Sequence, residues 1–141
     1  VRRLLTSVPN IDEVTLSVHC HDDLGLALAN TLAGLRAGAR QVSGCFNGRG
    51  ERAGSVAIEE VVMALETRRD YYGLTTAVDT AQIYPTSRLI SRVSGVPVQP
   101  NKSIVGANAF RHGSRIHQAG AALSRQNYEI MDRREIGWPE A

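Results

Sequence analysis

The fold is decided between residues 14 and 38, which read VTLSVHCHDDLGLALANTLAGLRAG. Residues 14–21 alternate apolar with small or polar side chains and contain several β-branched residues, a pattern that predicts a strand. Asp22 and Asp23 provide the chemistry of a helix N-cap. Apolar spacing predicts a helix that ends at Gly38, where glycine commonly follows a helix. One face of this helix holds Leu24, Ala27, Leu28, Thr31, Leu32 and Leu35.

A second strand and a second helix are predicted further along the chain. Residues 41–46 predict a short strand, and residues 47–54 form a glycine-rich turn. A helix is expected from Ser55 to about Arg69. Strands and helices that alternate with short links predict an α/β fold with parallel strands. The apolar stripe of the second helix consists of Ile58, Val61, Val62 and Leu65.

The rest of the chain is expected to be mainly helical. Asp79 and Gln82 resemble a capping pair, and Pro85 is expected to interrupt the helix that would follow. Further helices are predicted at residues 86–93 and 110–124, and a short extended piece at residues 128–131.

Two parallel strands can neither form a stable sheet alone nor close a barrel. Residues 1–5 resemble the end of a helix and include no initiating Met. We therefore expect a cytoplasmic fragment of a longer protein, divided into residues 1–73, which contain both strands, and residues 74–141.

Composition narrows the class of protein. The chain has 141 residues, of which 43% are hydrophobic and 21% charged, so it is not wholly disordered. A net charge of +2 and an aromatic content of 5% argue against a nucleic-acid partner. No apolar run approaches the ~20 residues of a membrane span. Two cysteines form no disulfide scaffold, and Cys45 is expected to be a small core residue.

His19 and His21 are candidate metal ligands. Residues two apart on a strand project from the same face, so both imidazoles can reach one divalent ion, while Cys20 points the other way. The alternative is a pair of hydrogen-bonded histidines at the end of a strand. His112 and His117 lie five apart, which is not the spacing of ligands on one helix.

The glycine-rich turn matches neither a dinucleotide fingerprint nor a P-loop. Glycines such as Gly48 and Gly50 allow a backbone to approach a ligand closely, and the turn leads toward a helix N-terminus that favours anions. The alternative is a simple tight turn, in which Glu51 and Arg52 form an ion pair that holds the loop.

Several stretches carry a resemblance to a known family. They read HCHDDLGLA at residues 19–27, NGRGERAG at residues 47–54 and NKSIVGANAF at residues 101–110. Residues 116–118, Tyr128 and residues 136–138 continue the match. In this order they resemble the 2-isopropylmalate synthases of the α-isopropylmalate/homocitrate synthase family, over nearly the whole chain.

The resemblance implies the C-terminal portion of a TIM barrel followed by a small, mainly helical subdomain. It also implies a metal-assisted condensation of acetyl-CoA with a 2-oxo acid, 3-methyl-2-oxobutanoate, to give 2-isopropylmalate in leucine biosynthesis. By this resemblance His19 and His21 hold a divalent metal ion (Mn²⁺, Mg²⁺ or Zn²⁺). The loop residues Gly48, Gly50, Glu51 and Arg52 would bind substrate at the carboxyl end of the barrel strands.

The resemblance further assigns His117 and Tyr128 to catalysis. His117 matches a subdomain histidine that assists proton transfer from the acetyl methyl group, and Tyr128 matches a tyrosine that reaches the same site. In this family the subdomain reaches into the active site of a partner subunit, which implies a homodimer.

The sequence departs from the family at five positions. Asp22 replaces an Asn, and Ser55 stands where the family has an Asn metal ligand, although Ser55 could simply cap the following helix. Near His117, Gly113, Arg115 and Ala119 replace a Glu, a Gly and an Asp. The alternatives are therefore a citramalate or homocitrate synthase, a lyase that runs the reverse cleavage, and a diverged paralogue without turnover.

Overall fold

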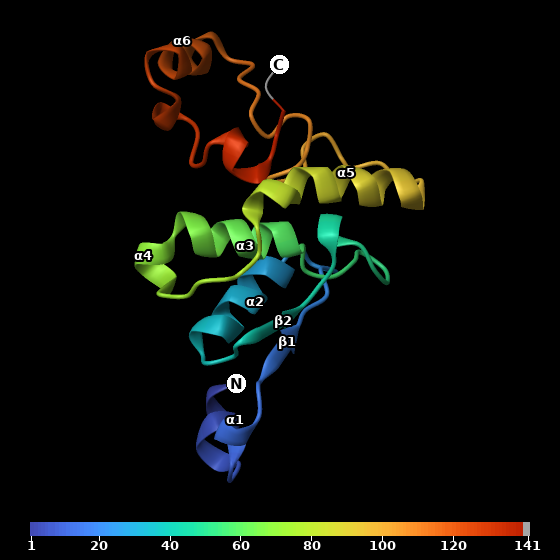
Figure 1. The fold of residues 1–141 in the computed structure, drawn as a ribbon, viewed down its shortest axis with the longest axis vertical. Coiled ribbons are helices and arrows are strands. Elements are labelled where there is room, and N and C mark those ends of the chain that lie inside the picture. The colour runs from blue at the N-terminus through green and yellow to red at the C-terminus, as the bar shows by residue number, and fades with distance from the viewer. Residues whose placement is uncertain (140–141) are drawn as a thin grey trace. The chain divides into compact units, whose positions relative to one another are not determined.

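The computed structural model describes residues 1–139, which form a mixed α/β structure with a small parallel sheet. Contacts divide the chain into a first unit, Val1–Val61, and a second unit that begins at Val62. Helix α3, Ile58–Thr67, begins in the first unit and ends in the second (Figure 1). The boundary expected at residue 73 remains a prediction.

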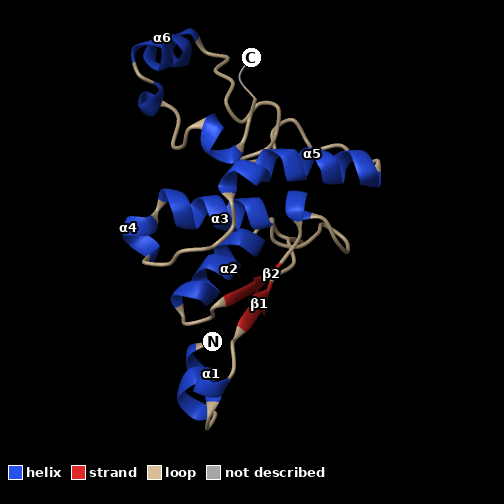
Figure 2. Cartoon of the chain, in the orientation of Figure 1, coloured by secondary structure: helices blue, strands red, loops and turns tan. Residues whose placement is uncertain are grey.

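The first unit contains the sheet. Strands β1 and β2 are parallel, and their register pairs Val18 with Val42. Figure 2 shows the two strands side by side. The elements of the first unit before α3 are helix α1 (Arg2–Ser7), a 3₁₀ turn (Ile11–Glu13), β1 (Ser17–His19), helix α2 (Ala27–Arg36), β2 (Gln41–Ser43) and a 3₁₀ turn (Phe46–Gly48).

Helix α2 packs closely on β1. A Cβ added at Gly34 would lie only 2.8 Å from Cγ1 of Val18, so a residue without a side chain permits this approach. Ala27, Thr31 and Leu35, four residues apart, are buried along the same side of the helix. The predicted strand–helix–strand order is thus present in the first unit.

The C-terminal end of α2 follows the prediction, but its start is displaced, because the N-cap residue is Leu26 and not Asp22 or Asp23. An Oδ1 oxygen of Asp22 accepts a hydrogen bond of 2.9 Å from the backbone N–H of Ala27. The chain turns between these residues, and Leu24 is 85% exposed, so its assignment to the buried face is wrong. Gly38, with φ +113°, directly follows the C-cap residue Ala37, as predicted.

Both strands are shorter than predicted because only three residue pairs form the ladder between them. Beyond the ladder, Cys45 forms an isolated parallel bridge with Ala57. Cys45 is exposed, so the expectation that it is a core residue is wrong.

The second unit contains no strand within the described residues (Figure 2). It is built from the remainder of α3 and from short helices connected by irregular segments. These elements are α4 (Arg69–Tyr72), a 3₁₀ turn (Thr80–Gln82), α5 (Ile83–Ser94), α6 (Arg115–Leu123) and two 3₁₀ turns (Arg125–Asn127 and Arg133–Ile136).

The core of the second unit joins residues that are distant in sequence. Ile83, Val105 and Ile136 are all fully buried. The ring of Trp138 lies 4.2 Å from that of Tyr84 and 5.4 Å from that of Phe110, measured between ring centroids. The C-terminal segment is therefore held on α5 by apolar and aromatic contacts.

Three expectations for the second unit are wrong. The helix expected at residues 110–124 begins only at Arg115. Pro85 does not interrupt a helix, because it is the third residue of α5, where a backbone N–H has no partner inside the helix. Residues 128–131 are not an extended piece, since Tyr128 has ψ −5° in a turn and residues 130 and 131 lie in a bend. The Asp79 cap is confirmed, with a bond of 3.1 Å from the N–H of Ala81.

Among the described helices, none combines the length and the hydropathy required to cross a membrane.

Candidate functional site

The imidazole rings of His19 and His21 lie together at the end of β1. Their Nε2 atoms are 3.3 Å apart, and the ring centroids are 4.9 Å apart with the planes at 87°. Both residues are exposed. The structure thus brings together the two residues that the sequence nominated as metal ligands.

A bond across the sheet determines which nitrogen of His19 carries the proton. His19 Nδ1 lies 3.0 Å from the carbonyl oxygen of Ser43, its ladder partner. A carbonyl oxygen only accepts, so Nδ1 carries the hydrogen, and the neutral ring has its lone pair on Nε2.

This lone pair is next to Nε2 of His21, an arrangement that suits one shared divalent cation. The same 3.3 Å separation also fits a direct hydrogen bond between His19 and His21, which was the alternative. Within residues 1–139, His, Cys, Asp and Glu side chains nowhere gather in a group of three or more that could hold a metal. Any further ligands would therefore be of another type or come from outside this part of the chain.

Ser55 lies beside His21 but does not cap the next helix. The two residues form an isolated antiparallel bridge. The Ser55 hydroxyl donates a hydrogen bond of 3.1 Å to the carbonyl oxygen of Arg49. Because α3 begins only at Ile58, the capping role considered for Ser55 is wrong. Ser55 instead closes the glycine-rich loop.

The glycine-rich loop folds back on itself beside the histidine segment. A Cβ at Gly54, which has φ +93°, would lie 1.9 Å from the carbonyl oxygen of Gly48. The Gly54 carbonyl accepts a bond of 2.9 Å from the N–H of Asp22, directly after His21. The backbones of the loop and of the segment that carries the two histidines are therefore joined.

An ion pair holds the tip of this loop. Arg52 Nε donates to a carboxylate oxygen of Asp23 at 2.8 Å, so the considered pairing of Arg52 with Glu51 is not the one formed. This hydrogen bond from Arg52 holds the pKa of Asp23 below its usual value. Both side chains are about half exposed, so the pair orients the loop more than it stabilises the fold.

A buried carboxylate supports the start of the loop. Glu59, in the first turn of α3, is fully buried. Its two carboxylate oxygens lie 3.0 and 3.1 Å from the backbone N–H of Asn47, which has φ +63°. Sequence reasoning missed Glu59, although an acidic residue in the first helical turn after a glycine-rich loop was a visible signal.

In the second unit, His117 and Tyr128 form a ring stack. The centroids lie 4.2 Å apart and the planes are inclined by 22°. His117 belongs to α6, whereas Tyr128 directly follows the 3₁₀ turn after α6. Both residues are exposed, so the stack is accessible to a ligand. The two residues nominated for catalysis are thus neighbours.

His112 and Glu129 lie next to this stack and were not nominated. His112 Nε2 is 3.1 Å from Oε1 of Glu129, and the side chains are only 18% and 12% exposed. The centroid of the His112 ring lies 6.3 Å from the ring centroid of His117 and 6.1 Å from that of Tyr128. No local pattern predicts this pair, because its members lie 17 positions apart in the sequence.

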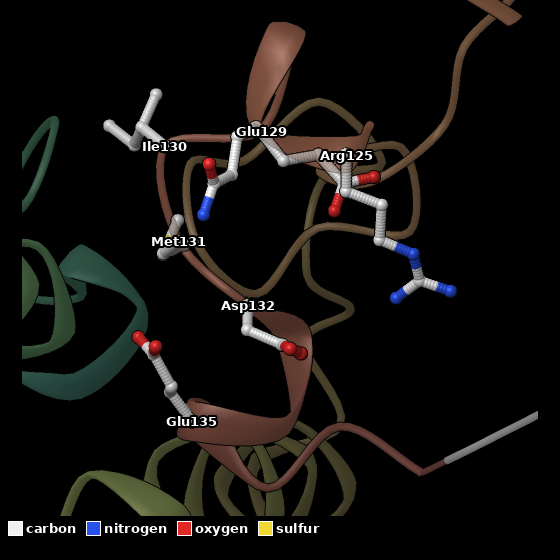
Figure 3. A pocket seen from close by; sticks show the side chains of 7 residues that line it. Arg125, Glu129, Ile130, Met131, Asp132 and Glu135 are labelled. Carbon is white, nitrogen blue, oxygen red and sulfur yellow. The ribbon is translucent and has the colours of Figure 1, made fainter. Parts of the chain in front are cut away.

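Beside Glu129 an open hollow of about 380 Å³ lies in the second unit (Figure 3). It combines one cationic side chain, Arg125, with three carboxylates and two apolar residues. Two of the three carboxylates are already paired, Glu129 with His112 and Asp132 with Arg134. The lining residues are Arg125, Gln126, Glu129, Ile130, Met131, Asp132 and Glu135.

The relatives found by comparison with known proteins carry the same name. Proteins named 2-isopropylmalate synthase from Burkholderia cenocepacia and Dechloromonas aromatica are 55% and 54% identical to this chain, over 98% and 99% of it. The protein of that name from Neisseria meningitidis is 56% identical over 97% of the chain. The matches cover 27%, 27% and 26% of these relatives, so the chain spans about a quarter of their length.

A family model described as HMGL-like matches residues 1–90. The match includes β1, β2, both histidines of the first unit and the whole glycine-rich loop. Since it covers more than half of the sequence, the chain belongs to the HMGL-like family.

Proposed function

We propose that this chain is part of a 2-isopropylmalate synthase, which condenses acetyl-CoA with 3-methyl-2-oxobutanoate. The observation that carries the proposal is the identity of 54–56% over nearly the whole chain to relatives of that name. In this proposal residues 1–73 are the last strands and helices of a TIM barrel, and residues 74–141 are the subdomain that follows it.

The geometry of the first unit supports this assignment. β1 and β2 are parallel, and both His21 and the glycine-rich loop follow the carboxyl ends of these strands. Active sites of TIM barrels lie at that end of the barrel. The two strands would be completed into a barrel by strands that are not in this sequence.

His19 and His21 would hold a divalent cation, Mn²⁺, Mg²⁺ or Zn²⁺. The residues fit such an ion because the bond to Ser43 leaves a lone pair on His19 Nε2, next to His21 Nε2. When bound, the cation would polarise the carbonyl of the 2-oxo acid as a Lewis acid. The role of His19 Nδ1 is to keep the ring in the tautomer that ligation requires.

The glycine-rich loop would bind substrate at the same end of the strands. Because Gly48 and Gly50 have no side chains, a substrate could closely approach the backbone there. The pairing with Asp23 holds the Arg52 side chain at the loop tip. Glu51, which is exposed, is the fourth residue of this loop that we propose to bind substrate.

His117 and Tyr128 would act on acetyl-CoA. The condensation removes a proton from the acetyl methyl group and joins that carbon to the ketone carbon of the 2-oxo acid, whose C=O π bond opens and whose oxygen takes up a proton to become a hydroxyl. Hydrolysis of the thioester then releases CoA. His117 would take up the methyl proton, while Tyr128 would fix the orientation of its ring. We place this stack in the active site of a partner subunit in a cytoplasmic homodimer.

The test is an assay of the full gene product with three 2-oxo acids. Release of the CoA thiol is followed with 3-methyl-2-oxobutanoate, pyruvate and 2-oxoglutarate in the presence of acetyl-CoA and Mn²⁺. We expect the highest kcat/KM for 3-methyl-2-oxobutanoate. Preference for pyruvate or 2-oxoglutarate would instead indicate a citramalate or homocitrate synthase.

A diverged paralogue without turnover is the second candidate. It is favoured by Ser55, which replaces an Asn metal ligand that the resemblance implies, and by Gly113 and Ala119, which replace two carboxylates implied around His117. Absence of thiol release with all three acids, from folded and metal-loaded protein, would support it.

A further inference from the structure

The ring of Tyr128 lies in a slot over Gly120 that an added side chain would narrow. A Cβ added at Gly120, which belongs to α6, would be 2.3 Å from Cε2 of Tyr128. One helical turn earlier on the same face, His117 stacks on the ring. Gly120 has no positive φ, so a Cβ there would strain no backbone torsion and would act by displacing the Tyr128 ring.

Both neighbours of Tyr128 in the sequence are anchored. The side-chain amide of Asn127 donates a hydrogen bond of 2.9 Å to the carbonyl oxygen of Gly120. On the other side, Glu129 pairs with Nε2 of His112, which must carry the hydrogen because a carboxylate only accepts. Tyr128 is thus fastened from both sides, to α6 and to the segment before it.

The pair of His112 and Glu129 is the better protected part of this arrangement. Its side chains are 18% and 12% exposed, whereas Tyr128 is 39% exposed. A charge-assisted hydrogen bond shielded from water is stronger than one at the surface. An exposed ring is therefore held in place by a less exposed polar contact.

We propose that His112, Glu129 and Gly120 are positioning residues, which hold Tyr128 in its stack against His117. They act through Tyr128 and touch no substrate. The effect on turnover rests on the proposed function, in which the stack takes part in proton transfer. The effect on ring geometry does not.

The geometry is tested in the full gene product with histidine labelled with ¹³C at Cε1. The His117 resonance is assigned by its loss in His117→Gln. A stacked Tyr ring shifts this resonance upfield, and Tyr128→Leu gives its position without the stack. We expect Glu129→Ala and Gly120→Ala to move the resonance toward the Tyr128→Leu position. An unmoved resonance in both variants would overturn the proposal.

Two matched controls accompany these variants. Gly113→Ala adds the same methyl group where nothing lies within 4 Å, and should leave the resonance in place. Glu135→Ala removes a carboxylate of the same segment that has no part in the pair, with the same expected result. A shift of equal size in these controls would contradict specific positioning. Should Gly120→Ala not fold, Glu129→Ala still decides.

The activity of the same variants separates this inference from the proposed function. We expect kcat to fall about 10²-fold in Glu129→Ala, the cost of a misplacement of about 1 Å, with KM for the 2-oxo acid within about twofold. Moved resonances in a protein without activity would contradict the proposed function and leave the positioning role standing. An unchanged kcat in an active enzyme whose resonance has moved would contradict the catalytic part of the inference.

Discussion

His19 Nδ1 lies 3.0 Å from the carbonyl oxygen of Ser43, the residue opposite His19 in the ladder of β1 and β2. The sheet therefore sets the tautomer of a proposed metal ligand through its own backbone. Histidine ligands in proteins are commonly oriented in this way, by an outer hydrogen bond from the nitrogen that does not face the metal. The parallel pairing of two short strands thus has a direct chemical consequence.

The glycine-rich loop should not tolerate a side chain at Gly54. Ala at this position places Cβ 1.9 Å from the Gly48 carbonyl oxygen and also requires φ +93°. We expect Gly54→Ala to lower the free energy of unfolding by about 3 kcal/mol or more. Gly25→Ala is the control, since Gly25 has φ +70° but nothing within 4 Å. It should cost only about 1 kcal/mol. Equal losses in urea unfolding would show that backbone strain, and not the clash, dominates.

Glu59 should stabilise the loop through its acceptor oxygens. Replacement by Ala removes the acceptors for the Asn47 N–H and leaves a cavity, for an expected loss of about 3 kcal/mol. Glu59→Gln retains one acceptor oxygen in the same volume, so we expect a loss of about 1 kcal/mol. Thermal unfolding of the three proteins measures the difference. Identical stability of the Gln and Ala variants would argue against the hydrogen bond.

The carboxyl group of Asp132 should titrate unusually low. Two hydrogen bonds lower the pKa of Asp132 from 3.8 to about 2: the bond from the Arg134 side chain has the larger effect, and the bond from the Arg134 backbone N–H has the smaller. Because the pKa is lowered on folding, this group stabilises the fold above about pH 4. That contribution is lost as the pH falls toward 2. In Arg134→Gln we expect the pKa to rise but to stay below 3.8, since the backbone bond of 2.9 Å remains. A carboxyl ¹³C titration that gives the same pKa in both proteins would contradict this cause.

Local periodicity was sufficient to predict the relation between His19 and His21. Side chains two apart on a strand share a face whatever the rest of the fold does, and the two Nε2 atoms lie 3.3 Å apart. Asp22 follows local rules only in part: its carboxylate accepts a bond from the N–H of Ala27, the first residue of α2, but the N-cap residue is Leu26. Such features depend on few neighbours and are readable without tertiary contacts.

Other features depend on partners that are distant in sequence. Cys45 lies on the same side as Gln41 and Ser43, which are also exposed, and only tertiary contacts decide which side of a short strand is covered. The pairing of His112 with Glu129 and the slot at Gly120 form only when the segment after α6 folds back on the helix. Pro85 was misread because a proline in the first turn of a helix costs little, unlike one in its middle.

The central claim is that His19 and His21 bind one divalent cation, and calorimetric titration of Mn²⁺ into the metal-free gene product tests it most directly. We expect His21→Ala to weaken binding about 10²-fold or more, because loss of a ligand should cost at least as much as loss of an outer-shell partner. His117→Ala, which removes an exposed histidine of the second unit, should leave the affinity unchanged. Unchanged Mn²⁺ affinity in His21→Ala and in the double variant His19→Ala with His21→Ala would contradict the account. The two histidines would then be a hydrogen-bonded pair and not a metal site.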